Sequence, residues 1–248
     1  MCEGLYTSRR DIAKKSIVWG AGVVFCFASA IGFLIEEEWL CVLMCLGTMI
    51  LVSIPLLLER YFSIKMNTGF YIFCVAYALG PMLGKAYKLY YTTLWWDKLL
   101  HTAAGVVFSA FGAYIAVRLN GSNQVNPLLY AVFGFCFSVT IAAVWEFFEY
   151  GVDCLFAADM QHDTVIHGIN SHYLAETVGG IFRIEDIQTV SVNGEPLEIG
   201  GYLDIGLIDT MHDMLVETVG AAGYAIYCLL NPGKRPAIYG AYLLDAGQ

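Results

Sequence analysis

Charged side chains are scarce in this sequence. Asp, Glu, Lys and Arg make up 14% of the 248 residues, whereas hydrophobic residues make up 58%. A soluble globular protein carries about 25% charged residues, because its surface faces water. The shortage of charge therefore excludes an ordinary water-soluble domain and predicts an integral membrane protein.

The sequence also lacks the cysteine pattern of a zinc or dithiol site. Its eight cysteines form no Cys-x-x-Cys pair, and most of them fall inside apolar stretches. There they act as small apolar side chains, so neither a disulfide framework nor a redox centre is expected. No glycine-rich phosphate-binding loop and no internal repeat occurs. The net charge of −9 disfavours nucleic acid as a partner.

Long stretches of the chain contain no charged residue at all. They run from Ser16 to Ile35, Trp39 to Leu58, Met66 to Gly84, Leu99 to Val117, Leu119 to Trp145 and Thr218 to Gly233. About 20 predominantly apolar residues cross a bilayer as one helix. The sequence thus predicts an all-α integral membrane protein, a six-transmembrane-helix bundle in which residues 1–248 form a single polytopic domain. The expected helices are Ile12–Ile35, Trp39–Arg60, Thr68–Tyr90, Asp97–Arg118, Pro127–Asp153 and Asp209–Leu230.

The Lys and Arg residues predict the orientation of these helices. If the N-terminus is cytoplasmic, nine of the 13 basic residues lie inside and four outside. Cytoplasmic loops are enriched in Lys and Arg, so both termini of this multi-pass cell-membrane protein are expected in the cytoplasm. The inner residues are Arg9, Arg10, Lys14, Lys15, Arg60, Lys65, Arg118, Lys234 and Arg235, and the outer ones are Lys85, Lys88, Lys98 and Arg183. Ala28-Ser29-Ala30 would suit signal-peptide cleavage, but the apolar stretch continues to Ile35, so a retained anchor is expected.

One long segment, from Cys154 to Asp204, is expected outside the membrane as an insertion between the fifth and sixth helices. Asn193-Gly194, flanked by Ile187–Val192 and Glu195–Ile199, predicts a short β-hairpin on a type I′ turn. About 50 residues are too few for an independent core, so the segment is expected to lie on the helices as a lid. Its histidines, His162, His167 and His172, lack metal-type spacing and are interpreted as polar loop residues.

Acidic and histidine residues occur in pairs at the ends of three predicted helices. The pairs are Asp97 with His101, Glu146 with Glu149, and Asp209 with Asp213. A spacing of three or four residues puts each pair on one helix face. The predicted topology brings all three ends to the outer side of the membrane. The antiparallel helices then create two levels, with His101, Glu146 and Asp213 one turn deeper than Asp97, Glu149 and Asp209.

This group of six residues suggests a metal site. An Asp at the centre of a membrane helix costs about 2.5–3.5 kcal/mol, so such residues persist mainly where they have a role. Carboxylates and imidazole from several helices suit a divalent cation, with Mg²⁺, Mn²⁺, Ca²⁺, iron and Zn²⁺ as candidates. We expect all six residues to be metal ligands. We assign catalytic roles to His101, Glu146 and Asp213, and expect at least four of the six to converge in one cavity that opens outward.

Simpler interpretations remain open. Asp97 and Asp209 stand where helices begin, so they could act as N-caps or favour the helix dipole. The function classes are a metal-dependent hydrolase or transferase acting on a lipid-linked envelope substrate, an ion or solute transporter or channel, and a non-catalytic envelope sensor. Transporters usually bind substrate near the bilayer midplane, which only Glu217 approaches. Gly220 and Gly223 after it favour close helix packing.

Four motifs resemble those of a known family. They are similar to motifs of the YjdF-like bacterial membrane proteins, a family of unknown function. The motifs are Asp97-Lys98-Leu99-Leu100-His101, Trp145-Glu146-Phe147-Phe148-Glu149, Asp209-Thr210-Met211-His212-Asp213 with Gly220-Ala221, and Asp159-Met160-Gln161. More distantly, the Asp-Lys-x-x-His helix start and the Asp-then-Gly final helix resemble the VanZ-like superfamily. That resemblance implies a role at the cell envelope linked to glycopeptide resistance. Glu149 stands where the VanZ-like pattern has an amide.

Overall fold

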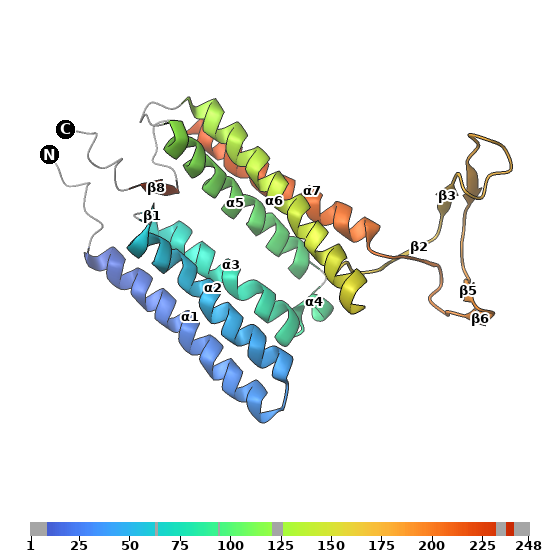
Figure 1. Cartoon of the computed structure of the whole chain (residues 1–248), viewed down its shortest axis with the longest axis horizontal. Helices are drawn as coiled ribbons and strands as arrows, with labels where there is room; N and C mark the ends of the chain where they lie inside the picture. Colours follow the sequence, from blue (N-terminus) through green and yellow to red (C-terminus); the bar gives the residue numbers. More distant parts are fainter. Residues whose placement is uncertain (1–8, 63, 94, 121–125, 232–236, 241–248) are drawn as a thin grey trace. The chain divides into compact units, whose positions relative to one another are not determined.

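The computed structural model describes residues 9–62, 64–93, 95–120, 126–231 and 237–240 (Figure 1). Among them lie seven helices, α1 Arg9–Ile35, α2 Trp39–Tyr61, α3 Thr68–Ala86, α4 Leu89–Thr92, α5 Trp96–Asn120, α6 Pro127–Phe156 and α7 Leu207–Leu230. Six of them, all but α4, are long and apolar enough to cross a membrane. The prediction of an all-α membrane protein with six spans is confirmed. Lys234 and Arg235, counted for the orientation, lie outside the described residues.

The bounds of several helices differ from the predicted ones. The third span ends at Ala86, and the chain then forms the short helix α4. The fifth span continues to Phe156, so Glu146 and Glu149 lie well inside α6. The last span begins at Leu207, because its first turn is capped by an upstream aspartate described below.

The chain divides into two compact units. The helical unit comprises Met1–Ala142 and Met214–Gln248, and the connecting unit comprises Ala143–Asp213. The division passes through α6 and α7, so the end of α6 and the start of α7 belong to the connecting unit. The single polytopic domain proposed from the sequence stays a prediction.

In the helical unit, α1, α2 and α3 pack on one another, and α3 also contacts α5 (Figure 1). One apolar cluster includes Val52, Tyr71 and Val107, all nearly inaccessible to solvent. Many large apolar side chains point outward instead, as expected of helices that face lipid. Ile17, Val24, Leu43 and Ile50 are each about two-thirds exposed.

A buried ion pair joins α1 and α2. Lys15 is only 3% exposed, and its Nζ donates to Glu59 Oε1 and to the Met66 carbonyl, both at 2.6 Å. The same Glu59 oxygen accepts the Met66 backbone N–H at 2.8 Å. Lys15 was counted among the basic residues on the inner side, and the structure shows that it also holds the first two helices to the strand before α3.

That strand pairs with the chain beyond α7. Strand β1 (Ile64–Met66) is antiparallel to β8 (Ile238–Gly240). The adjoining Asn67 N–H donates to the Ala237 carbonyl at 3.0 Å, while the Asn67 side chain caps α3 by accepting from Phe70 N–H at 2.8 Å. No sequence pattern predicted this ladder, which joins segments far apart along the chain.

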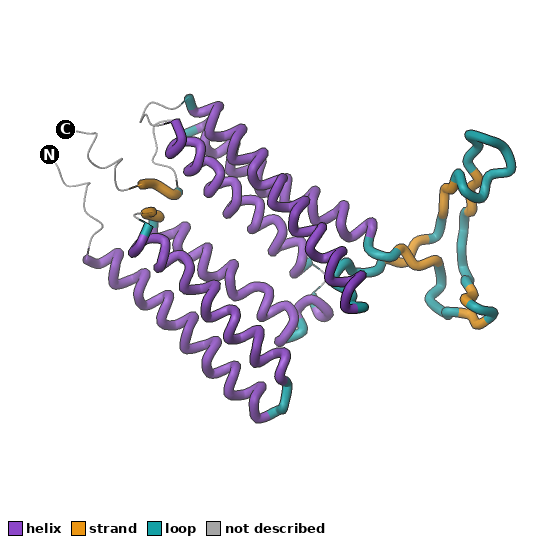
Figure 2. Tube along the Cα trace, in the orientation of Figure 1, coloured by secondary structure: helices purple, strands orange, loops and turns teal. Residues whose placement is uncertain are grey.

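The connecting unit contains three short antiparallel ladders (Figure 2). They pair β2 Thr164–Ile166 with β7 Tyr202–Asp204, β3 Ile169–Ser171 with β4 Phe182–Ile184, and β5 Ser191–Val192 with β6 Glu195–Pro196. The predicted hairpin is confirmed, although its strands are shorter than expected. Asn193 and Gly194 have φ values of 55° and 91°, as a type I′ turn requires. The other two ladders were not predicted.

Candidate functional site

The first predicted pair lies in the helical unit, at the start of α5. Asp97 occupies the first turn, where a negative charge stabilises a helix. Its Oδ1 is 3.7 Å from His101 Nε2, and its Oδ2 is 3.3 Å from Lys98 Nζ. His101 is 8% exposed. The i, i+4 spacing therefore brings the two side chains together on one helix face, as the sequence predicted.

Glu217 of α7 lies on the other side of this imidazole. Its Oε2 is 3.9 Å from His101 Nδ1, and Ser138 Oγ of α6 donates to its Oε1 at 3.3 Å. The Ser138 hydroxyl also lies 3.2 Å from the Gly105 carbonyl. Glu217 is 2% exposed. The sequence had shown Glu217 only as a carboxylate near the midplane, because its pairing with His101 involves residues far apart in the chain.

Glycines bring α5 and α7 into backbone contact in the helical unit. A Cβ on Gly105 would lie 2.1 Å from the Glu217 carbonyl oxygen, and one on Gly220 would lie 2.1 Å from that of Thr102. Small residues allow such close approach between membrane helices. Gly220 thus packs as the sequence suggested, whereas Gly223 has no neighbouring atom within 4 Å of its Cβ position.

The other two pairs lie in the connecting unit and are buried. Glu146 and Glu149 of α6 are 4% and 8% exposed, and Asp209 and Asp213 of α7 are 9% and 1% exposed. Glu149 Oε1 accepts a hydrogen bond from Trp145 Nε1 at 2.8 Å. Such low exposure shows that these carboxylates face protein and not lipid.

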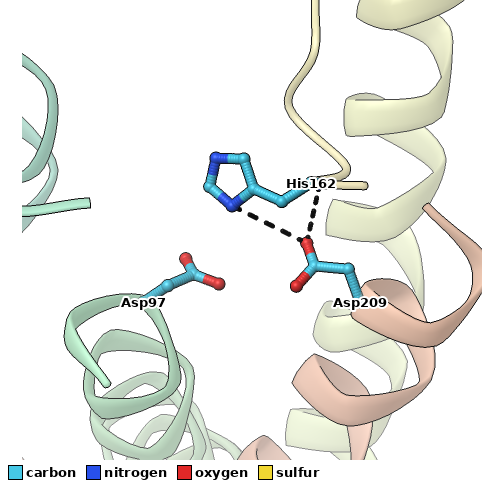
Figure 3. Close-up of side chains that lie close together, drawn as sticks. All are labelled: Asp97, His162 and Asp209. Atoms are coloured by element: carbon cyan, nitrogen blue, oxygen red, sulfur yellow. Dashed lines mark hydrogen bonds and ion pairs between the residues drawn. The ribbon is translucent and has the colours of Figure 1, made fainter. Parts of the chain in front are cut away.

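Asp209 contacts His162, which lies in the segment between α6 and α7, residues 157–206, here called the connecting segment. The His162 backbone N–H donates to Asp209 Oδ2 at 2.9 Å, and Nδ1 of the ring is 4.0 Å from the same oxygen (Figure 3). The Asp209 carboxylate therefore accepts a hydrogen bond from a loop residue and does not cap its own helix. Asp204 takes that role, because its Oδ2 accepts from the Ile208 N–H at 2.9 Å. The interpretation of His162 as a polar loop residue stays a prediction, and no spacing pattern could have revealed its contact with Asp209.

The residues before His162 tie the end of α6 to the start of α7. The Asp153 carboxylate accepts the backbone N–H groups of Met160 and Gln161 at 2.7 and 2.9 Å. The Gln161 side chain in turn donates to Thr210 Oγ1. The Asp159-Met160-Gln161 motif, singled out in the sequence, thus positions His162 on Asp209.

The connecting segment around His162 is strongly acidic. Partial desolvation, followed by the charges of Asp159 and Asp204, raises the pKa of Asp163 above its usual range, while the His162 imidazole lowers it. A negative potential of this kind attracts cations to the same part of the connecting unit.

The predicted site residues are thus divided between the two units. Asp97 and His101 belong to the helical unit with Glu217, and the two carboxylate pairs belong to the connecting unit. Carboxylate and imidazole groups in both units are of the type that binds divalent cations. Convergence of at least four of the six residues on one cavity stays a prediction.

Six apolar spans and buried acidic and histidine side chains define a polytopic helical membrane protein. The model of the family described as "Predicted membrane protein (DUF2238)" matches residues 15–232. Because this match covers most of the chain, the protein belongs to that family. No curated protein and no solved structure matches the chain.

Proposed function

We propose that residues of the three pairs bind divalent metal ions. The proposed ligands are Asp97, His101, Glu146, Glu149, Asp209 and Asp213. The observation that carries this proposal is the burial of four carboxylates and one imidazole, each at most 9% exposed, in a membrane protein. Buried carboxylates repel one another, and a bound cation offsets that cost.

Helix periodicity supports a shared face for ligands of the same helix. On α7, Asp213 lies one turn before Glu217 and therefore on the same helix face. On α6, Glu149 lies eleven residues after Ser138, which is close to three full turns and therefore the same face.

We infer that the site belongs to a hydrolase or transferase acting on a lipid-linked envelope substrate. A bound divalent cation would supply an activated water or polarise a phosphate or ester. His101, Glu146 and Asp213 would bind the cation or accept the proton that the water releases. An envelope role would agree with the resemblance of the motifs to the VanZ-like superfamily. The family that matches the chain does not itself imply such a role.

Metal binding tests this proposal directly. We expect the purified protein in detergent to bind Mn²⁺ in calorimetry and to carry a divalent metal in elemental mass spectrometry. Glu146→Gln and Asp213→Asn should each weaken Mn²⁺ affinity at least about tenfold, because each removes a charged oxygen ligand. Glu176→Gln makes the same chemical change at an exposed position of the connecting segment and should leave the affinity unchanged. Failure of the wild-type protein to bind Mn²⁺ at millimolar concentration would contradict the proposal.

A second candidate, ion transport through the same residues, is favoured by the burial of Glu217 and Ser138. Both are buried polar residues that lie beyond the predicted pairs, Ser138 toward the middle of α6 and Glu217 toward the middle of α7. Intramembrane ionisable residues of this kind mark ion and proton paths. Cation flux into proteoliposomes that disappears in Glu217→Gln would favour transport. A sensor would instead lose function on removal of the connecting segment and tolerate Glu146→Gln.

We also propose that both termini are cytoplasmic and that the connecting segment is outside. The asymmetry of Lys and Arg supports this orientation. In a cysteine-free background, a cysteine at Asn193 is expected to react with a membrane-impermeant thiol reagent added to intact cells. A cysteine at Lys14, an exposed residue of α1, should react only after the cells are opened. The reverse labelling pattern would overturn the orientation.

A further inference from the structure

The His101 ring is placed between two carboxylates that come from different directions. Its Nε2 faces Asp97 on the same helix at 3.7 Å, and its Nδ1 faces Glu217 on α7 at 3.9 Å. Each nitrogen of an imidazole acts as donor or acceptor, depending on where the proton resides. The two carboxylates therefore decide which nitrogen of His101 is available to a ligand.

Glu217 is held more firmly than Asp97. Its carboxylate is 2% exposed and accepts from Ser138, whereas the Asp97 side chain is 21% exposed. The backbone at Glu217 also touches α5, since the glycine at position 105 leaves room for its carbonyl oxygen. A fixed, buried acceptor beside Nδ1 and a more accessible acid beside Nε2 make the two sides of the ring unequal.

We propose that Glu217 is a positioning residue that accepts the Nδ1–H of His101 and thereby leaves Nε2 as the ligand atom on the Asp97 side. Histidines that bind metals commonly donate their other ring N–H to a carboxylate, which fixes the tautomer and the ring orientation. The separation of 3.9 Å is about 1 Å longer than an N–H···O hydrogen bond, and such bonds are often long before a ligand binds. The assignment of Nε2 as a metal ligand rests on the proposed function, whereas the tautomer does not.

The proton position can be measured without any metal. Solid-state nuclear magnetic resonance of ¹⁵N-histidine-labelled protein in bilayers, at a pH of about 8.5, separates protonated from unprotonated ring nitrogens. That pH lies about two units above the usual histidine pKa of about 6.5. His101→Gln identifies the His101 signals among those of the five histidines. We expect Nδ1 of His101 to be protonated in the wild type.

Two substitutions separate a positioning role from a structural one. Glu217→Gln keeps an acceptor oxygen and should keep the proton on Nδ1, whereas Glu217→Leu removes the acceptor and should move the proton off Nδ1. Thr218→Val changes the next residue of α7, whose hydroxyl donates to the Met214 carbonyl of the same helix, and should leave the His101 signals unchanged. An unprotonated Nδ1 in the wild type overturns the proposal even if no variant folds. An unchanged His101 spectrum in folded Glu217→Leu does the same.

Mn²⁺ affinity then distinguishes the two proposals. If both hold, Glu217→Leu should weaken Mn²⁺ binding by about 10–100-fold, the range for residues that orient a metal-binding histidine, and Glu217→Gln should weaken it less. If the wild type binds no Mn²⁺ but shows the expected tautomer, the metal site fails and the positioning of His101 by Glu217 stands. If Glu217→Gln abolishes binding with Nδ1 still protonated, Glu217 is itself a ligand and its assignment as a positioning residue fails.

Discussion

Substitution of Lys15 by methionine is expected to lower the free energy of unfolding by about 3–5 kcal/mol, the range for breaking a buried ion pair. Methionine matches the length of the lysine stem but carries no charge. It would leave the Glu59 carboxylate, whose side chain is only 11% exposed, without the Lys15 cation, and the Met66 carbonyl without the Lys15 donor. An uncompensated buried charge costs more than the ion pair itself contributes.

A neighbouring lysine and a second substitution provide the controls. Lys14→Met makes the same change at an exposed position of α1 and should alter stability by less than about 0.5 kcal/mol. The double variant Lys15→Met/Glu59→Gln removes both charges and keeps an oxygen for the Met66 N–H, so it should recover most of the loss. Far-ultraviolet circular dichroism during titration with a denaturing detergent measures these differences. Equal stability of Lys15→Met and Lys14→Met would show that the ion pair contributes nothing.

The spans were predictable because each is a local property of the sequence. The second span, from Trp39 to Tyr61, differs from the predicted range by one residue. Its bounds follow from an apolar stretch that ends at Glu59 and Arg60. The same logic predicted the i, i+4 contact of Asp97 with His101, because helix periodicity alone sets it.

Contacts between distant segments were not predictable. The sequence around Lys15 predicts a basic residue near the inner end of a helix, but it does not identify its partner Glu59, which lies 44 residues away. Ladder β1–β8 and the pairing of His101 with Glu217 depend in the same way on how the helices pack. Apolar periodicity specifies which face of a helix is buried, but it does not specify which residue that face meets.

Substitution of Gly220 by alanine is expected to separate α5 from α7. The new Cβ would lie 2.1 Å from the Thr102 carbonyl oxygen and 3.3 Å from the Gly105 Cα. These are backbone atoms, so no side-chain rotation can relieve the overlap and the helices must move apart. Overpacking of this kind costs about 1–3 kcal/mol, which exceeds the gain of about 1 kcal/mol that alanine brings to a helix.

Gly223→Ala provides the matched control, three residues further along α7. Nothing lies within 4 Å of its Cβ position, so the helix-propensity gain is unopposed there. We expect Gly223→Ala to be as stable as the wild type or more so, and Gly220→Ala to be less stable than Gly223→Ala by at least 1 kcal/mol, the lower end of the overpacking cost. The same detergent titration measures both.

The effect of Gly220→Ala should extend to the site. Movement of α7 away from α5 carries Glu217 away from His101, since its carbonyl oxygen contacts the backbone at Gly105. The ¹⁵N signals of His101 should therefore change in Gly220→Ala and remain as in the wild type in Gly223→Ala. If Gly220→Ala lowers stability but leaves the His101 signals unchanged, the close approach of the two helices stabilises the fold without setting the geometry of the imidazole.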